Sequence, residues 1–347
     1  MIPSCIQRIT RRQEGGDEAY FTYVEEADDE ANKVSQRMRL GMKTVVFAYH
    51  NMGIAGLEAL MRHGYDITAV FTHEDDPDEN CWFGSVKNWA AQKNINTFTT
   101  EDINSHEWME KINGLKPDFI FSFYYRKIIN SKILTIPKMG AFNLHGSLLP
   151  VYRGRCPANW VIINGEKVTG VTLHYMIDKP DAGDIVGQKE VAIASTDTAK
   201  TLYDKLCGAA NLLLDELLPQ MKTGRIPNRK QDLAAGSYYG GRKPEDGRID
   251  WNKSAEEIYN LIRGVTEPYP GAFAFLDNDD KIIIWWAEPV VSEDAGISGK
   301  MIIVNKEVLV QTAKNAIKLF DIEVDGKRIK GELISSYFKN GKVTVLK

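Results

Sequence analysis

The sequence predicts an α/β protein with a mainly parallel, Rossmann-like sheet, followed by a smaller β-rich domain. From residue 42 onward, apolar β-type runs alternate with amphipathic helical segments, which is the pattern of a parallel sheet covered by helices. After Gly236 the pattern changes to short β-type runs separated by turns, which is typical of a small barrel or sandwich. We therefore expect an extension at residues 1–41, a first domain at residues 42–235 and a β-rich, OB-like domain at residues 236–347.

The amino-terminal extension is polar and contains the acidic run EEADDE at residues 25–30. Such a composition cannot bury enough apolar surface to offset the entropy lost on ordering. We therefore expect residues 1–41 to be flexible and the folded unit to begin at Met42.

The first domain opens with a predicted strand, helix and strand. The run KTVVFAY at residues 43–49 is typical of a buried strand, GIAGLEALMRHG of a helix that ends at Gly64, and DITAVFT of a second strand. A long helix late in this domain should be capped by Asp197 and closed by Pro219 and Gly224. Between them we expect helices near residues 85–93 and 105–114, and strands at residues 118–123, 140–145, 168–176 and 183–193.

The composition disfavours several classes of protein. A formal net charge of −4 over 347 residues gives no general attraction for a polynucleotide, so we expect no nucleic-acid partner. No run approaches the roughly 20 apolar residues that a membrane span needs, and the start of the chain lacks the apolar segment of a secretory signal. The four cysteines have no paired spacing, and the six histidines have no metal-ligand spacing. We therefore expect a cytoplasmic protein without a disulfide framework or a metal site.

Chemistry-bearing side chains gather at the end of the predicted strand 140–145. Asn143 and His145 are two residues apart, so in a strand they face the same side, and sheets of this kind bind ligands at the carboxyl ends of their strands. The segment DAGD adds the carboxylates of Asp181 and Asp184. A histidine beside a carboxylate can move protons near neutral pH, and an asparagine amide can donate a hydrogen bond to a developing oxyanion. Together these residues suit acyl transfer.

Three alternatives compete with this interpretation. Asn143 and His145 could be a turn residue and a structural histidine. Ser147 could be the nucleophile of a Ser–His–Asp hydrolase, but LHGSLLP lacks the G-x-S-x-G elbow of that class. A dinucleotide site is disfavoured because YHNMGIAG lacks the G-x-G-x-x-G spacing, and its glycines Gly53 and Gly56 are expected to serve a turn and helix packing.

The motifs FNLHGSLLPVYRGRCPANWVIINGE, TGVTLHYM and DAGDIV resemble the formyltransferase family that uses 10-formyltetrahydrofolate. The resemblance continues through FSFYYR, GRKPEDGRIDW and PYPGAF, so it covers nearly everything from Met42 onward. It implies the formyltransferase fold, with 10-formyltetrahydrofolate as cosubstrate and no metal. It also implies that Asn143 stabilises the oxyanion, that His145 shuttles the proton, and that Asp181 raises the pKa of His145.

Side-chain chemistry suggests residues for the acceptor, and the resemblance implies residues for the folate. For the phosphates of an acceptor, the candidate cations are Arg153, Arg242 and Lys243, because an arginine fork matches phosphate geometry. The aromatic residues Tyr124, Tyr125 and Tyr239 could stack on a base or a pterin, although such residues are more often core. The folate is expected at Lys127, Ile128, Ile129, Arg155, Ile177, Asp178, Lys179, Pro180 and Asp181.

The family includes enzymes that formylate methionyl-tRNA, glycinamide ribonucleotide or nucleotide-linked amino sugars. Five acids between Glu74 and Glu79 would repel a polynucleotide backbone, which disfavours methionyl-tRNA. The purine enzymes generally lack so large a second domain. The segments KTVVFAYHNMG, FTHEDDP and FSFYYR most resemble enzymes that formylate UDP-4-amino-4-deoxy-L-arabinose, in lipid A modification and polymyxin resistance. Methionyl-tRNA formylation and a non-catalytic binding protein on the same fold remain the alternatives.

In those sugar enzymes a dinucleotide-dependent decarboxylase follows the formyltransferase half. The chain stops where the decarboxylase half would begin, so we expect a stand-alone formyltransferase. Its expected small-molecule partners are a nucleotide sugar and folate. The sequence leaves open whether the protein forms a homo-oligomer.

Overall fold

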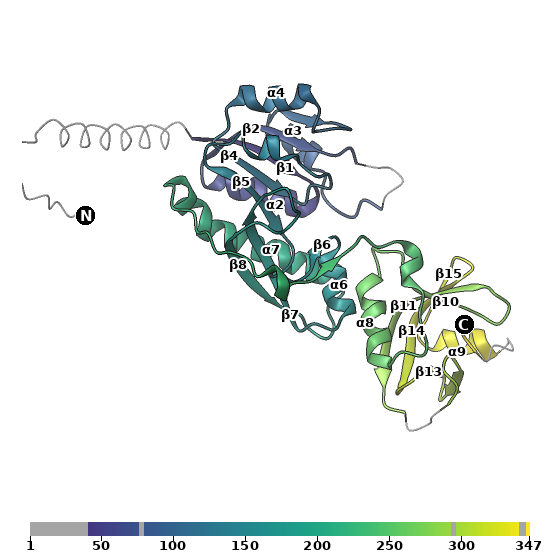
Figure 1. Cartoon of the computed structure of the whole chain (residues 1–347). Helices are drawn as coiled ribbons and strands as arrows, with labels where there is room; N and C mark the ends of the chain where they lie inside the picture. Colours follow the sequence, from purple (N-terminus) through teal and green to yellow (C-terminus); the bar gives the residue numbers. More distant parts are fainter. Residues whose placement is uncertain (1–40, 76–79, 293–295, 340–344) are drawn as a thin grey trace, which may run out of the picture.

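The computed structural model describes residues 41–75, 80–292, 296–339 and 345–347. The predicted flexibility of the extension concerns residues 1–40, which lie outside the described residues, as does part of the acidic run at residues 74–79. The described chain forms a larger first lobe and a smaller second lobe. In Figure 1 the first lobe runs from purple through teal to green, and the second lobe runs from green to yellow.

The first lobe alternates strands and helices along the chain. Its first elements are β1 (Met42–Ala48), α2 (His50–Arg62), β2 (Tyr65–Thr72), α3 (Val86–Gln92), β3 (Thr97–Thr99), α4 (His106–Leu115), β4 (Phe119–Phe123), α5 (Ser131–Leu134) and β5 (Gly140–His145). It continues with β6 (Arg153–Gly154), α6 (Pro157–Ile163), β7 (Val168–Tyr175), β8 (Ile185–Ala192), α7 (Ala199–Lys222) and β9 (Tyr238–Tyr239).

Seven of these strands form one sheet, in the order β3-β2-β1-β4-β5-β7-β8. The neighbours from β3 to β5 pair in parallel, whereas β5 with β7 and β7 with β8 pair antiparallel. The mainly parallel α/β sheet is confirmed. Its antiparallel edge was not indicated by the sequence pattern, and it is the part of the sheet that carries the candidate site.

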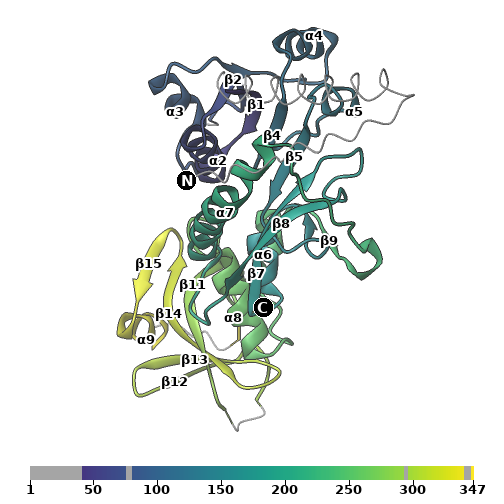
Figure 2. The same ribbon diagram turned by 90° about the vertical axis from the view of Figure 1, so that its left-hand side faces the viewer.

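Strand β1 shows why this sheet is covered on both faces. Val46 and Ala48 belong to the core that includes α2 and α7, whereas Val45 and Phe47 belong to the core that includes α4 and α5. Successive side chains of a strand point to opposite faces, so a continuous apolar run requires helices on each side. Figure 2 shows α2 and α7 along one side of the strands.

The helix α7 begins and ends differently from the sequence prediction. Thr198 is its N-cap, with a hydroxyl that accepts a backbone N–H of the first turn, so the prediction of Asp197 as the cap was wrong. The prediction that Pro219 closes the helix was also wrong, because α7 continues to its last turn through the buried residues Leu218 and Met221. Apolar packing there outweighs the hydrogen bond that proline removes.

The second lobe is an antiparallel sheet with two helices. Its strands are ordered β10-β11-β14-β13-β12, with β15 beside β14, and this confirms the predicted β-rich domain. The two helices were not predicted. The elements are α8 (Ala255–Val265), β10 (Ala272–Phe275), β11 (Lys281–Val290), β12 (Met301–Val304), β13 (Glu307–Gln311), β14 (Ala316–Val324), β15 (Lys327–Lys330) and α9 (Glu332–Lys339).

The two lobes are joined where α6 packs against α8. The Nδ2 atom of Asn159 donates to the carbonyl oxygen of Gly264 at 2.8 Å, and the buried Arg263 donates to the carbonyl oxygen of Asp197 at 3.0 Å. A Cβ added to Gly264 would lie 2.6 Å from Cγ1 of Ile163, so the helices approach at a glycine. Within the described ranges, no helix is long and apolar enough to cross a membrane.

Gly56 allows α2 to lie against β4, as expected for a glycine that serves helix packing. A Cβ added there would collide with the buried ring of Phe123, so we predict that Gly56→Ala lowers the free energy of unfolding by about 1–3 kcal/mol. Gly208→Ala in α7 is the matched control, because a Cβ there meets nothing within 4 Å. It should stabilise the protein slightly, since alanine is the better helix former. Denaturant unfolding checks both variants, and an unchanged stability of Gly56→Ala would contradict this packing.

Candidate active site

Two neighbouring strands place polar side chains together at one end of the sheet. Asn143 and His145 lie at the carboxyl end of β5, and β7 runs antiparallel beside it with His174 directly opposite Asn143. Cross-strand neighbours of this kind project from the same face of a sheet. The chain then leaves β7 and enters β8 through a loop that carries Asp181.

One oxygen of the Asp181 carboxylate is shared by three side chains. Its Oδ1 lies 3.5 Å from Nδ2 of Asn143, 3.5 Å from Nδ1 of His145 and 3.6 Å from Nε2 of His174. Its other oxygen, Oδ2, accepts a hydrogen bond of 2.9 Å from the backbone N–H of Gly154. The structure therefore brings the predicted residues Asn143, His145 and Asp181 together and adds His174.

The backbone fixes the tautomer of His174 and, through it, the orientation of Asn143. Nδ1 of His174 lies 2.8 Å from the carbonyl oxygen of Tyr175, which can only accept, so Nδ1 carries the hydrogen. In the neutral ring Nε2 is then an acceptor, and it receives a hydrogen bond of 3.1 Å from the Asn143 amide. The amide nitrogen therefore faces His174, and its second contact is the 3.5 Å approach to Asp181, at the upper limit for a hydrogen bond.

His145 is also held by a backbone carbonyl. Its Nε2 lies 2.8 Å from the carbonyl oxygen of Tyr152, so Nε2 donates, and Nδ1, which faces Asp181, is the nitrogen left to exchange a proton. Ser147 is fully buried, and its hydroxyl donates to the carbonyl oxygen of Val151 at 2.7 Å. This serine stabilises the loop after β5 and does not have the geometry of a hydrolase nucleophile.

Asp181 is held in its ionised form. Burial alone would raise the pKa of Asp181, but the imidazoles of His145 and His174 and the N–H of Gly154 outweigh burial and hold that pKa well below its usual range. The site therefore contains a negative charge at neutral pH, enclosed by the Asn143 amide, the N–H of Gly154 and the two imidazoles.

The residues predicted to bind folate are Arg155, which follows β6, and two segments, one after β4 and one that ends at Asp181. Residues 127–129 follow β4, the parallel neighbour of β5, and residues 177–181 lead into Asp181 itself. Nζ of Lys127 donates to two backbone carbonyls, at 2.8 and 2.7 Å, so this side chain holds the loop. Ile129 is buried. The side chains of Ile128, Arg155, Ile177, Asp178, Lys179 and Pro180 are exposed.

The predicted cations differ in their surroundings. The guanidinium of Arg242 donates to a backbone carbonyl at 2.8 Å and lies 4.5 Å from the ring of Trp160, so it is already occupied. Lys243 is exposed. Arg153 is buried, and its Nε has no hydrogen-bond partner.

The aromatic residues singled out in the sequence are partly buried and pack against the core. Tyr239 stacks on Tyr152, with ring centroids 4.9 Å apart, and Tyr125 stacks on His73 at 4.4 Å. Tyr124 contacts the ring of Tyr203 edge-on at 5.5 Å. Each ring therefore already has an aromatic partner at the edge of the core.

Two residues of the site were missed by sequence reasoning. His174 lies in the motif TGVTLHYM, where a histidine in an apolar strand was a readable signal, but its value depends on β7 being the antiparallel neighbour of β5. Gln231, fifty residues after Asp181, donates through Nε2 to the carbonyl oxygen of Asp181 at 3.1 Å and so holds the loop. Asp184, the second acid of DAGD, contributes its backbone carbonyl to the N–H of Tyr175.

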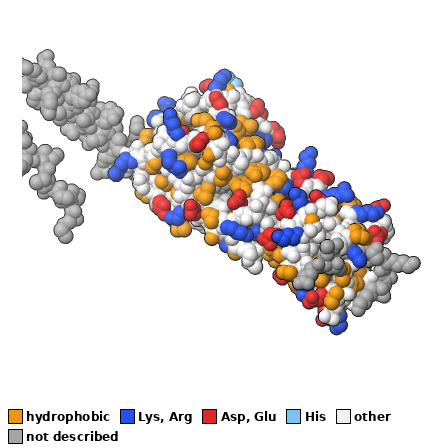
Figure 3. All heavy atoms as spheres, turned by 60° about the horizontal axis from the view of Figure 1, so that its bottom comes forward, with side chains coloured by type: hydrophobic (Ala, Val, Ile, Leu, Met, Phe, Trp, Pro, Cys, Tyr) orange, Lys and Arg blue, Asp and Glu red, His pale blue; other side chains and the backbone are white. Residues whose placement is uncertain are grey.

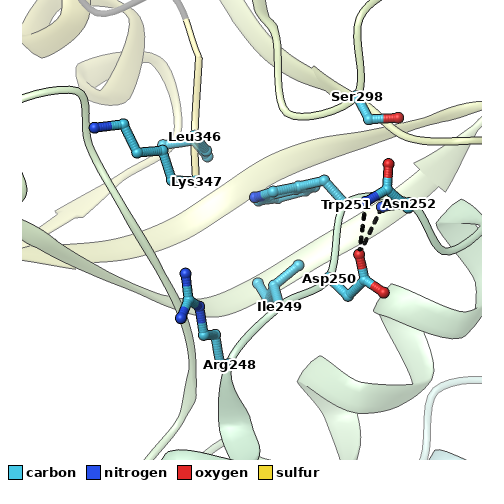
Figure 4. Close-up of a pocket in the computed structure, with 8 residues that line it drawn as sticks. All are labelled: Arg248, Ile249, Asp250, Trp251, Asn252, Ser298, Leu346 and Lys347. Carbon is cyan, nitrogen blue, oxygen red and sulfur yellow. Dashed lines mark hydrogen bonds between the residues drawn. The ribbon is translucent and has the colours of Figure 1, made fainter.

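A separate cavity lies in the second lobe. Figure 4 shows its lining, which includes Trp251, Ser298 and Lys347 and encloses about 440 Å³. Its carboxylate, Asp250, accepts hydrogen bonds from Asn252 within the same turn. None of the predicted site residues line it. In the part of the chain that the structure describes, no three His, Cys, Asp or Glu side chains are grouped as a metal site would require.

Comparison with known families identifies the family to which the chain belongs. Residues 42–217 match the family described as formyl transferase, and residues 242–337 match the formyl transferase C-terminal domain. The chain belongs to the formyl transferase family. The family and the fold predicted from the motifs are confirmed.

Solved structures share this fold. One is the N-formyltransferase from Helicobacter canadensis in complex with folinic acid and dTDP-3-aminofucose, at 22% identity and a TM-score of 0.62, over 80% of this chain and 98% of that chain. Another is WlaRD, a sugar 3N-formyl transferase with dTDP and 5-N-formyl-THF, at 20% identity and 0.60, over 82% and 98%. A third is HypX from Aquifex aeolicus in complex with tetrahydrofolic acid, at 16% identity and 0.57, over 86% of this chain but 48% of that one.

Asp181 should remain ionised at a pH where a free aspartate is protonated. Because its pKa is lower in the folded than in the unfolded chain, the ionised carboxylate stabilises the fold above about pH 4, and this contribution is lost as the pH falls further. Carboxyl-carbon NMR, with the signal assigned by its loss in Asp181→Asn, should show a midpoint below the model-peptide value of about 3.9. A midpoint above about 4 would mean that burial outweighs the neighbouring imidazoles.

Proposed function

We propose that the protein transfers the formyl group of 10-formyltetrahydrofolate to the amine of a nucleotide-linked amino sugar, with UDP-4-amino-4-deoxy-L-arabinose as the expected acceptor. The observation that carries this proposal is the convergence of Nδ2 of Asn143 and Nδ1 of His145 on one oxygen of Asp181. A hydrogen-bond donor and a proton carrier then lie around one point, as acyl transfer to an amine requires.

In the proposed reaction the acceptor amine attacks the formyl carbon, and a carbon–nitrogen bond forms as the carbonyl oxygen becomes an oxyanion. The Asn143 amide donates to that oxygen, using the hydrogen whose contact with Asp181 is 3.5 Å long. The bond between the formyl carbon and N10 of the folate then breaks. His145 takes the proton that the amine loses and delivers it to N10, so the products are tetrahydrofolate and the N-formyl sugar.

Asp181 and His174 support these two steps. The negative charge of Asp181 stabilises the imidazolium that exists while His145 carries the proton. His174 holds the Asn143 amide so that its nitrogen faces the centre. In the opposite orientation the amide would present its oxygen, which would repel an oxyanion.

We propose that the folate lies against residues 127–129, Arg155 and the loop at residues 177–181. Two exposed apolar side chains support this, because Ile128 is 70% exposed and Ile177 is 50% exposed on the segments near Asp181. A pterin ring system needs apolar contacts of this kind beside a few polar groups.

The proposed domain division is an extension at residues 1–41, a catalytic domain at 42–235 and a β-rich domain at 236–347. The buried clusters support a second boundary between residues 221 and 249, because one lies within residues 249–346 and the others lie within residues 42–221. The strand β9, which follows residue 236, still pairs with β6 of the first lobe.

Charge favours a nucleotide sugar over tRNA. Five of the six residues from Glu74 to Glu79 are acidic, and on the face drawn in Figure 3 acidic and basic side chains are interspersed. A polynucleotide needs several cations along its backbone, whereas a sugar diphosphate needs few. The similar structures from Helicobacter canadensis and of WlaRD, with dTDP-3-aminofucose and dTDP, support the nucleotide-sugar class. The choice of UDP-4-amino-4-deoxy-L-arabinose, and with it a role in lipid A modification and polymyxin resistance, is supported by the sequence resemblance.

Replacing His145 by alanine should lower kcat by about two to four orders of magnitude, because the proton carrier is removed. The matched control is His106→Ala, since His106 is exposed at the start of α4 and should leave kcat unchanged. Release of tetrahydrofolate with the sugar acceptor measures both variants, and circular dichroism confirms that both fold. Near wild-type turnover by a folded His145→Ala protein would refute the mechanism.

UDP-4-amino-4-deoxy-L-arabinose should be formylated at a rate that changes little between about 50 and 200 mM salt, because only two phosphates are bound. Methionyl-tRNA should not be formylated under the same conditions. A panel of UDP- and dTDP-linked amino sugars compares the acceptors directly. Formylation of methionyl-tRNA with a steep dependence on salt would contradict the proposed acceptor. It would leave the proposed chemistry of the site unchanged.

A further inference from the structure

Arg153 is a buried charge without a partner among the residues that the structure describes. In the described ranges, the buried Asp, Glu, Lys and Arg side chains are Asp118, Arg153, Asp197, Arg263 and Asp321. The other four are paired, with Lys138, Lys205, Asn260 and Arg328 among their partners. For Arg153, in contrast, the described chain provides no acceptor, and its Nε is fully enclosed and unsatisfied.

Such a charge is costly to bury, because the protein must replace the hydration of the guanidinium with hydrogen bonds. Arg153 is 9% exposed, and Nε is its fully enclosed nitrogen, so solvent reaches the guanidinium only at its two Nη atoms. In native proteins, unpaired buried charges occur mostly at functional sites, where ligand binding or catalysis compensates for their cost.

The position of Arg153 connects it to the candidate active site. The preceding residue, Tyr152, accepts a hydrogen bond of 2.8 Å from His145, and the following residue, Gly154, donates one of 2.9 Å to Asp181. Tyr152 has a φ of 58°, a left-handed conformation that is unfavourable for a bulky side chain. Backbone strain at Tyr152 therefore occurs beside Arg153, and both chain neighbours of Arg153 touch the catalytic residues through their backbone.

We propose that Arg153 binds an anionic group of a ligand at this site, a phosphate or a carboxylate that presents two oxygens to the guanidinium. The proposal rests on the proposed function, in which the nucleotide sugar brings a diphosphate and the folate brings the carboxylates of its glutamate. An arginine fork binds two such oxygens in parallel. Arg242 is less suited, because its guanidinium is already bonded and stacked on Trp160.

The test uses the full-length chain and three variants: Arg153→Met, Arg153→Lys and Arg263→Met. Calorimetric titration with UDP, and separately with folinic acid, measures binding, and thermal unfolding without ligand measures stability. Arg153→Met should unfold at the same or a higher temperature, because it removes an unpaired buried charge, and should bind one ligand about 10- to 100-fold more weakly. Arg153→Lys should show a smaller loss, since it keeps the charge without the fork.

Arg263→Met is the matched control, because Arg263 is also buried but is hydrogen-bonded to Asn260 and to the carbonyl oxygen of Asp197. It should lower the unfolding temperature and leave both affinities unchanged, since its removal leaves buried partners unpaired.

Weaker binding of UDP alone assigns the anion to a phosphate, and weaker binding of folinic acid alone assigns it to a carboxylate. The proposal is overturned if Arg153→Met binds both ligands as the wild type does, if both affinities fall equally, or if the wild type binds neither. Binding is measured without catalysis. A wild-type protein that binds UDP through Arg153 but transfers no formyl group would therefore refute the proposed function and not this inference.

Discussion

The ionised carboxylate of Asp181 is the interaction on which the other contacts of the site depend. It is mostly withdrawn from water, yet two imidazoles and the N–H of Gly154 keep it charged. A low local dielectric strengthens each of these contacts, and it also makes the loss of any one partner expensive. Asn143, His145 and His174 are therefore held as one set, and a change in any of them alters the surroundings of the others.

The sheet topology produces this set. Asn143 and His145 come from β5, His174 comes from the antiparallel neighbour β7, and Asp181 comes from the loop between β7 and β8. The backbone beside β6 completes the arrangement, because Tyr152 accepts from His145. Because β7 runs antiparallel to β5, a side chain of β7 lies directly opposite a residue at the end of β5. A parallel neighbour would not form the same directly opposed pair.

Residues whose role depends on local spacing could be predicted from the sequence. Asn143 and His145 were predicted as neighbours because residues two apart in a strand share a face. His174 could not be placed, since its role depends on the direction and register of β7, which tertiary packing decides. The sequence also could not show which arginine already has a partner. Arg153 and Arg242 lie in similar local sequence, and only the fold shows that Arg242 stacks on Trp160 whereas Nε of Arg153 has no acceptor among the described residues.

The helix predictions were wrong or incomplete for a different reason. Asp197 and Thr198 are adjacent and both can cap a helix, and the ion pair of Asp197 with Lys205 leaves Thr198 as the cap. The helix α8 had a readable signal that was not used, since Ser254 and Glu257 form a capping box just before an amphipathic segment. The first failure is a true ambiguity of the sequence, whereas the second is a missed pattern.

The dependence of His145 on Asp181 is tested most directly by kcat values for Asp181→Asn, His145→Ala and the double variant with one acceptor. If Asp181 acts through His145, replacing it should change kcat little once His145 is absent, and the double variant should be about as slow as the slower single variant. Losses that multiply in the double variant would contradict this account, because the two residues would then contribute independently.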